Sequence, residues 1–235
     1  MRMAMNTISK VDIANLNLTR DGAVYVHAAL SPYLCDQFEV VLASNKKGQP
    51  GVRLTGCAQL VQLLENESVV ASLVQTISGR QLKPVRAILF DKSPDNNWAL
   101  GWHQDRTIIV KNRFEVPGFG PWTIKAGLQH VAPPFSVIER MVTVRIHLDD
   151  VPECNAPLLV ALGSHSKGLI AEQYVADAVN SSKIIRCLAA RGDVWLYSTP
   201  ILHASDRARS AGQRRVLQVD YSDDSLPGGL EWLGI

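Results

Sequence analysis

The chain has 235 residues, of which 46% are hydrophobic and 20% are charged, and 24 Lys and Arg against 22 Asp and Glu give a formal net charge of +2. This length suits one large domain or two small ones, and the hydrophobic content is that of a folded protein rather than a disordered one. The charge lacks the basic surplus typical of proteins that bind phosphate backbones, so nucleic acid is not expected as a partner.

Hydrophobic runs and cysteines define the expected compartment. The longest uninterrupted apolar run, Ala156 to Leu162, is far shorter than the roughly 20 residues of a membrane-spanning helix. No secretory signal follows Met1. The four cysteines form no CxxC pair: Cys35, Cys57, Cys154 and Cys187. We therefore expect a cytoplasmic protein with free thiols and no membrane partner, while the oligomeric state stays open.

The N-terminal third is predicted to be mainly helical. Ser31 and Pro32 are a typical N-cap and first helical residue, and apolar residues recur at helical spacing over 33–42 and 60–77. From Pro84 onward, short β-like runs alternate with Gly and Pro turn signals. The runs are 85–90, 107–110, 122–125, 141–148, 158–162, 184–187, 194–197, 201–203 and 214–221. Many short strands predict a mainly β protein, a sandwich or jelly roll, with N-terminal helices packed on one sheet.

One predicted strand, 141–149, alternates strictly between apolar and polar side chains. Its apolar residues are Val142, Val144, Ile146 and Leu148, and its polar ones are Thr143, Arg145, His147 and Asp149. In a half-exposed strand the polar face would meet water, whereas in a two-sheet roll it would line an inner cavity. The pattern alone leaves both interpretations open.

His103 and Asp105 are two residues apart, so on a strand they share one face and can reach the same metal ion. A second imidazole from a distant strand would complete a 2-His-1-carboxylate triad, the typical site of non-haem Fe(II) oxygenases. His203 is the candidate. A second His-x-Asp, His147 with Asp149, competes for the role.

The number of intervening strands favours the first pair. A jelly-roll oxygenase has about four strands between its His-x-Asp and its last ligand. Between Asp105 and His203 we count the runs beginning at 122, 141, 158, 184 and 194, whereas only three of these follow Asp149. His147 is therefore expected to line the cavity or the core.

The segment after His203 adds a possible anion site. Ser205 follows two residues later and Arg214 begins the next predicted strand. A hydroxyl and a guanidinium fork together suit a carboxylate, as a dicarboxylate co-substrate would require. Since side chains alternate along a strand, only one of Arg214 and Arg215 can face inward.

Five motifs then occur in a characteristic order between about residues 84 and 222. They are Trp98-Ala99-Leu100-Gly101-Trp102-His103-Gln104-Asp105, Asn155-Ala156-Pro157-Leu158, Gly163-Ser164-His165, Gly192-Asp193, and His203-Ala204-Ser205 with Arg214-Arg215. In combination they resemble the phytanoyl-CoA dioxygenase family of Fe(II)/2-oxoglutarate oxygenases. The chain departs from the family at Ala156, where a glycine is usual, and at Ala161-Leu162, where a proline often precedes Gly-Ser-His.

The resemblance implies a double-stranded β-helix, the cupin-like jelly roll, as a single oxygenase domain over residues 1–235. A helical cover would span 1–83, the jelly-roll core 84–222 and a C-terminal tail 223–235. The family's motifs imply that iron is bound by His103, Asp105 and His203. They also imply that Arg214 and Ser205 hold the 5-carboxylate of 2-oxoglutarate, that O₂ is the other co-substrate, and that His165 belongs to a structural turn.

The expected activity is hydroxylation of a small molecule with release of succinate and CO₂. Two alternatives are a metal-dependent isomerase or dioxygenase that does not use 2-oxoglutarate, and a non-catalytic ligand-binding barrel. Four residues are candidates for substrate contact: Arg145, Thr143, Lys125 and His130. Arg145 in the cavity would need an anion, which we assign to the substrate. Its alternatives are pairing with Asp149 or Asp150, or binding 2-oxoglutarate.

Overall fold

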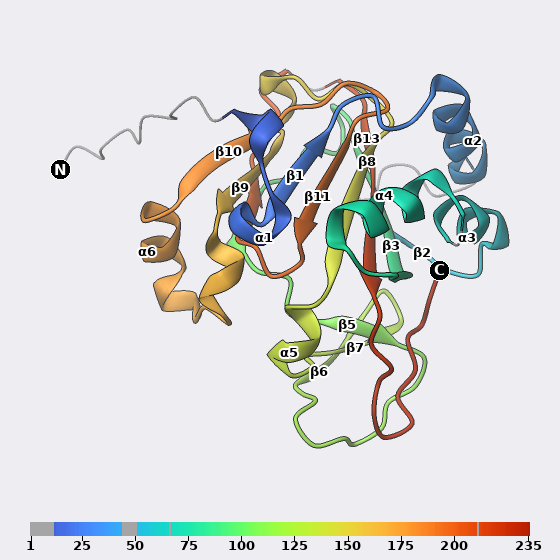
Figure 1. Ribbon diagram of the computed structural model, residues 1–235, viewed down its shortest axis with the longest axis vertical. Helices are drawn as coiled ribbons and strands as arrows, with labels where there is room; N and C mark the ends of the chain where they lie inside the picture. Colours follow the sequence, from blue (N-terminus) through green and yellow to red (C-terminus); the bar gives the residue numbers. More distant parts are fainter. Residues whose placement is uncertain (1–11, 44–50, 66, 211) are drawn as a thin grey trace.

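A six-stranded antiparallel sheet forms the largest layer of the computed structural model, which describes residues 12–43, 51–65, 67–210 and 212–235 (Figure 1). Its strands, in spatial order, are β1 (Ala23–Val26), β11 (Val194–Ser198), β8 (Val142–His147), β13 (Arg214–Ser222), β3 (Lys83–Lys92) and β2 (Val52–Leu54). Strands far apart in the sequence are neighbours here, because β1 pairs with β11 and β13 pairs with both β3 and β8.

A four-stranded antiparallel sheet forms the second layer. Its order is β10 (Lys183–Cys187), β9 (Leu158–Leu162), β12 (His203–Ser205) and β4 (Leu100–His103). From β8 to β13 the chain passes repeatedly between the two sheets, and an apolar cluster that includes Val160 and Trp195 joins them. The chain is therefore a double-stranded β-helix, and the prediction of a mainly β jelly roll is confirmed.

A three-stranded sheet lies at one end of the roll, at the bottom of Figure 1. It consists of β5 (Ile108–Val110), β7 (Leu128–Val131) and β6 (Trp122–Lys125). Its apolar residues pack with the short helix α5 (Phe135–Ile138) and with Leu230 and Trp232 of the C-terminal tail. This sheet carries two candidate site residues, Lys125 and His130, on neighbouring strands.

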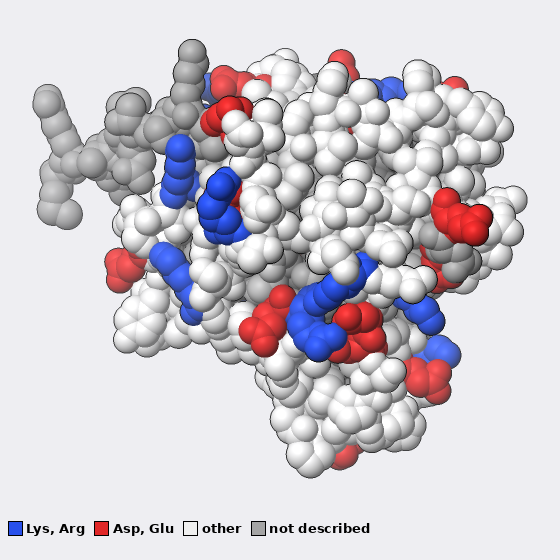
Figure 2. Space-filling model, in the orientation of Figure 1, with Lys and Arg blue, Asp and Glu red and all other residues white. Residues whose placement is uncertain are grey.

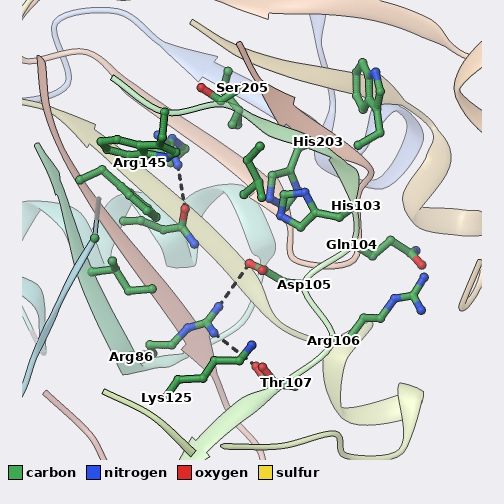
Figure 3. Close-up of a pocket in the computed structure, with 18 of the residues that line it drawn as sticks. Arg86, His103, Gln104, Asp105, Arg106, Thr107, Lys125, Arg145, His203 and Ser205 are labelled. Atoms are coloured by element: carbon green, nitrogen blue, oxygen red, sulfur yellow. Dashed lines mark hydrogen bonds and ion pairs between the residues drawn. The ribbon is translucent and has the colours of Figure 1, made fainter. Parts of the chain in front are cut away.

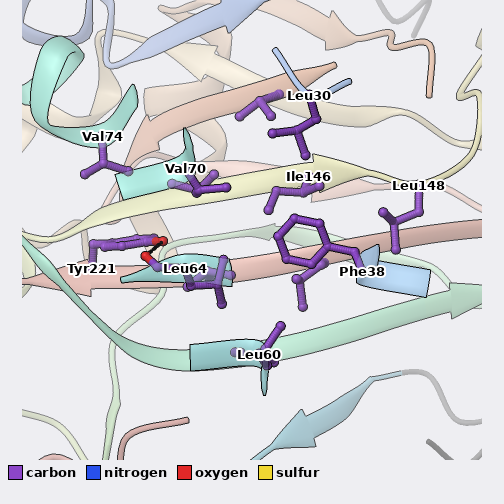
Figure 4. Close-up of a cluster of buried hydrophobic side chains, with 14 of the residues drawn as sticks. Leu30, Phe38, Leu60, Leu64, Val70, Val74, Ile146, Leu148 and Tyr221 are labelled. Carbon is purple, nitrogen blue, oxygen red and sulfur yellow. Dashed lines mark hydrogen bonds between the residues drawn. The ribbon is translucent and has the colours of Figure 1, made fainter. Parts of the chain in front are cut away.

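Three helices cover the outer face of the large sheet: α2 (Pro32–Leu42), α3 (Ala58–Leu64) and α4 (Val69–Ser78). The side chain of Ser31 caps α2 by accepting a hydrogen bond from the Leu34 amide. The apolar face of β8 packs beneath these helices, with Ile146 and Leu148 beside Phe38 (Figure 4). Each such buried side chain contributes about 1.5–3 kcal/mol of hydrophobic stabilisation.

The remaining short elements lie in the connections. They are η1 (Ile13–Asn15), α1 (Leu18–Asp21), η2 (Glu153–Asn155), η3 (Ser164–Lys167), η4 (Glu172–Tyr174) and α6 (Val175–Asn180). None of the helices in the described ranges has the length and apolar character needed to cross a bilayer. All four cysteines are free thiols.

The structure corrects several predicted elements. The helical pattern over 60–77 is two helices rather than one, because Ser68 caps a new helix with a hydrogen bond from the Ala71 amide. The predicted strand 201–203 begins only at His203. Strands β1 and β2 belong to the large sheet, so the described part of 1–83 is more than a helical cover. Finally, β8 is buried along its whole length, which excludes a half-exposed strand.

Candidate metal centre

The two sheet-edge strands β4 and β12 bring His103 and His203 together. The strands are antiparallel, and these two residues are direct partners in the register. The ring centroids are 4.3 Å apart. Together with Asp105, they form a group whose ligand atoms all lie within 4.8 Å of one another. This spacing is suited to three ligands on one face of a single metal ion.

Backbone carbonyls orient both imidazoles. His103 Nδ1 lies 2.7 Å from the Gly101 carbonyl oxygen, and His203 Nδ1 lies 3.0 Å from that of Ile201. A carbonyl only accepts hydrogen bonds, so Nδ1 carries the proton on each ring and Nε2 retains its lone pair for a metal. Burial lowers the pKa of His203 to about 4, which keeps its ring in the neutral, metal-binding form.

Gln104, between the two ligands, points away from the site and anchors a neighbouring loop. Its amide nitrogen donates to the carbonyls of Gly168 and Pro200, at 3.0 and 2.8 Å, and its oxygen accepts from the Ile170 amide at 2.9 Å. These bonds fix the chain on both sides of Gln104, and thus the direction in which His103 and Asp105 project.

A buried arginine holds the carboxylate of the triad. Arg86 Nη2 donates to Asp105 Oδ2 at 3.2 Å, and its Nε donates to Asp220. Thr143 donates to the other oxygen of Asp220, at 2.9 Å. Burial opposes ionisation of Asp105, but Arg86 and the two imidazoles outweigh it and hold the pKa of Asp105 below its usual value. The sequence reasoning did not identify Arg86, because a lone arginine in a strand carries no motif.

The second His-x-Asp motif does not form a comparable site. His147 is 2% exposed, and neither ring nitrogen has a hydrogen-bond partner in the described structure. Asp149 instead pairs with Arg215 at 2.7 Å. The third candidate imidazole, His165, lies against Gly22 and contacts the Thr19 carbonyl at 3.1 Å, as expected of a structural turn.

A group of buried cations, which we call the inner basic cluster, lies on one side of the imidazole pair. It comprises Lys92, Arg145 and Arg214, with the Ser205 hydroxyl 3.3 Å from Lys92 Nζ. Figure 3 shows Arg145 and Ser205 on the side of the imidazoles away from Arg86. None of the three cations pairs with a carboxylate in the described ranges. Lys92, which is opposite Arg214 in the register, was not predicted from the sequence.

The inner basic cluster is electrostatically strained. Burial and the neighbouring Arg214 and Arg145 lower the pKa of Lys92 to about 7, while burial and Arg145 lower that of Arg214 to about 9. Buried charges are costly without a counterion, so the cluster requires an anion. Arg214 also donates to the Ala156 carbonyl, at a residue with φ of +48°, a left-handed conformation that explains why glycine is usual there.

Arg214 and Arg215 face opposite sides of β13. Arg214 is buried and lines the cavity, whereas Arg215 points outward and pairs with Asp149 and Glu39. The alternation of a strand therefore assigns the anion site to the first of the two arginines.

One cavity of about 1230 Å³ contains the triad, Arg145, Arg214 and Ser205. Two predicted substrate residues, Lys125 and His130, also line it. Thr143 does not, which corrects that expectation, because its hydroxyl is buried against Asp220 and Thr199. Arg145 donates to Gln218 at 2.7 Å and belongs to the inner basic cluster rather than to a separate anion site.

These residues fit the groups that the predicted family uses. Two neutral imidazoles and one carboxylate on one face are a donor set suited to Fe(II). The inner basic cluster has the charge and the unsatisfied donors, including Arg214 Nε and Arg145 Nε, that a dicarboxylate would satisfy.

Several solved structures share this fold. The chain is 19% identical to AviO1 from Streptomyces viridochromogenes Tue57, with a TM-score of 0.63, covering 90% of this chain and 94% of that one. It is 16% identical to SnoN, a non-heme alpha ketoglutarate dependent epimerase of nogalamycin biosynthesis, with a TM-score of 0.63 and coverage of 91% and 88%. HygX from Streptomyces hygroscopicus, solved with nickel and 2-oxoglutarate, is 14% identical, with a TM-score of 0.59 and coverage of 87% and 84%. A comparison with curated proteins gives no match.

The family model with the description phytanoyl-CoA dioxygenase matches residues 18–216. The match spans the large sheet, the triad and the start of β13. The chain therefore belongs to the phytanoyl-CoA dioxygenase family, a group of Fe(II)/2-oxoglutarate-dependent enzymes.

Proposed function

We propose that the protein is an Fe(II)- and 2-oxoglutarate-dependent oxygenase that hydroxylates a C–H bond of a small molecule. The overall reaction consumes the substrate, O₂ and 2-oxoglutarate and gives the hydroxylated product, succinate and CO₂. One observation carries the proposal: the metal-binding triad and the inner basic cluster share a single cavity.

In this proposal His103, Asp105 and His203 hold the iron, and the iron with 2-oxoglutarate and O₂ supplies the oxidising chemistry. The protein supplies geometry. Gly101 and Ile201 orient the two imidazoles through their carbonyl oxygens. Arg86 positions Asp105 by occupying one side of its carboxylate.

The inner basic cluster binds the 5-carboxylate of 2-oxoglutarate. Arg214 offers a planar fork of donors, Lys92 offers a compact charge, and the Ser205 hydroxyl adds a neutral hydrogen bond. Arg145 lies in the same cluster and adds positive charge. Binding the dianion also compensates cations that burial otherwise leaves costly.

The inner basic cluster also supports this function over the two alternatives. An isomerase or dioxygenase that does not use 2-oxoglutarate, or a passive ligand-binding barrel, has no need for buried cations beside a metal triad. Relatives of the same fold catalyse other outcomes, since SnoN is an epimerase and SnoK a carbocyclase. Hydroxylation is therefore tested by product mass, because only hydroxylation adds one oxygen atom to the substrate.

The test combines metal binding with turnover. Calorimetry with Co(II) should show one site in the wild type and in His147→Ala, and a severe loss in His103→Ala, which keeps only two ligands. With Fe(II), 2-oxoglutarate and air, the wild type should release succinate, and a substrate should increase the rate. Metal lost from His147→Ala but retained by His103→Ala, or turnover of substrate without succinate, would contradict the proposal.

A further inference from the structure

A second group of cations lines the cavity, on the other side of the triad from the inner basic cluster. It comprises Arg53 on β2, Lys125 on β6 and His130 on β7, which we call the outer basic cluster. Three separate elements converge here. In Figure 3, Lys125 lies beside Arg86, on the opposite side of Asp105 from Arg145 and Ser205.

The outer basic cluster has unsatisfied donors. His130 is 1% exposed, and neither of its ring nitrogens has a hydrogen-bond partner in the described ranges. The buried Nε of Arg53 also has none. Cations elsewhere on the surface are treated differently, since Arg113 pairs with Glu115 and Arg140 with Asp223. On the face shown in Figure 2, basic side chains are dispersed and several lie directly against acidic ones.

No group already assigned to the cavity neutralises the outer basic cluster. Arg86, its nearest buried neighbour, is committed to Asp105 and Asp220. The 5-carboxylate of 2-oxoglutarate is assigned to the inner basic cluster. Burial, together with Arg53, Arg86 and Lys125, lowers the pKa of His130 to about 4. The ring is thus neutral and offers one N–H donor beside two cations.

An apolar wall completes the cavity. Leu100 and Trp102 of β4 and Val175 and Ala176 of α6 line it. Trp102 packs in the same apolar cluster as Val175, which fixes the wall. A ligand that satisfies the whole cavity therefore combines an anionic end with an apolar part.

We propose that Arg53, Lys125 and His130 bind an oxyanion of the substrate, a carboxylate or a phosphate, while its apolar part lies against the wall formed by Leu100, Trp102, Val175 and Ala176. The substrate class is thus a small organic acid or phosphate ester. This inference rests on the proposed function, because it assigns the second anion only after 2-oxoglutarate occupies the inner basic cluster. It moves the substrate's anionic contact from Arg145, as expected from the sequence, to the outer basic cluster.

The experiment uses the protein loaded with Ni(II) and saturating 2-oxoglutarate, so that the inner basic cluster is filled and no turnover occurs. Calorimetry compares hexanoate, hexyl phosphate and hexanol, which share one apolar chain and differ in the head group. Hexanoate or hexyl phosphate should bind at least about tenfold more tightly than hexanol, the scale of a charge-assisted hydrogen bond. The tighter of the two acids identifies the oxyanion.

Matched double variants separate the site from the overall charge. Arg53→Gln/Lys125→Gln should weaken the preferred acid by at least about tenfold. Lys183→Gln/Arg186→Gln removes the same two residue types from exposed positions on β10, outside the cavity, and should change affinity less than about twofold. His130→Phe keeps a ring of similar size and should weaken the acid by roughly two- to tenfold through loss of one neutral donor.

Equal losses in the two double variants, or hexanol binding as tightly as both acids, would overturn the assignment. Failure of the proposed function is a separate outcome. A protein that binds 2-oxoglutarate and releases succinate but shows no preference for acids would refute only the outer site. A protein that binds hexyl phosphate through Arg53 and Lys125 but does not bind 2-oxoglutarate would refute the oxygenase assignment.

Discussion

Replacing Arg86 with methionine tests the ion-pair network behind the triad. Arg86 has a side chain that is 9% exposed, and it bridges Asp105 and Asp220, whose side chains are 22% and 1% exposed. Removing one partner of a buried ion pair typically costs about 3–5 kcal/mol, because the remaining charge is left buried. Asp220 keeps a hydrogen bond from Thr143, and Asp105 is partly accessible to water. We therefore expect a loss near the lower limit, about 3 kcal/mol in the metal-free protein.

Urea denaturation of the metal-free protein measures this loss. The double variant Arg86→Met/Asp220→Asn should recover at least half of it, since the amide carries no charge and can still accept from Thr143. Arg140→Met is the control, because Arg140 is half exposed in its pairs with Asp223 and Asp224 and should cost less than about 1 kcal/mol. A loss in Arg86→Met no larger than that of the control, or a double variant no more stable than the single one, would refute the reasoning.

Two further predictions address the co-substrate and acid stability. Arg214→Leu should weaken 2-oxoglutarate binding by about 1.5–3 kcal/mol in calorimetry while metal binding persists, and Arg215→Leu should leave both unchanged; a larger effect at Arg215 would contradict the observed register. Burial opposes ionisation of Asp193, but hydrogen bonds from Tyr25 and two backbone amides hold the pKa of Asp193 below its usual value. Its stabilisation is therefore present above the unfolded-state pKa of about 4 and is lost as the pH falls through the lower folded-state value. Asp193→Asn should cost about 1.5–3 kcal/mol at neutral pH, and the difference from wild type should shrink on acidification below about pH 4; a difference independent of pH would refute this.

Local periodicity was sufficient for much of the fold. The Ser31-Pro32 start of α2, the bounds of β6 and β9, and the two faces of β8 follow from side chains within one element, where caps, turns and alternation operate. The spacing of His103 and Asp105, and the choice of Arg214 over Arg215, also depend only on the alternation of a strand.

Long-range pairing decided the rest. The four residues of β1 are too few for a reliable pattern, and they form a strand because β11, about 170 residues later, offers a free edge. Lys92 and Arg86 belong to one strand without a motif, and only the register with β13 places the first opposite Arg214 and the second beside Asp220. Pairing between strands also brings His203 to His103 and leaves His147 buried without a partner.

The sequence by itself thus determined which residues carry suitable chemistry and which side of an element they occupy, because those properties depend on neighbours a few positions away. The tertiary structure decided which of these residues meet. His103 and Arg214 come from different sheets, Lys125 and Arg53 from strands more than seventy residues apart, and the charge balance of the cavity is the sum of all of them. Electrostatic compensation acts through space, so the cations that need an anion become visible only when the chain is folded.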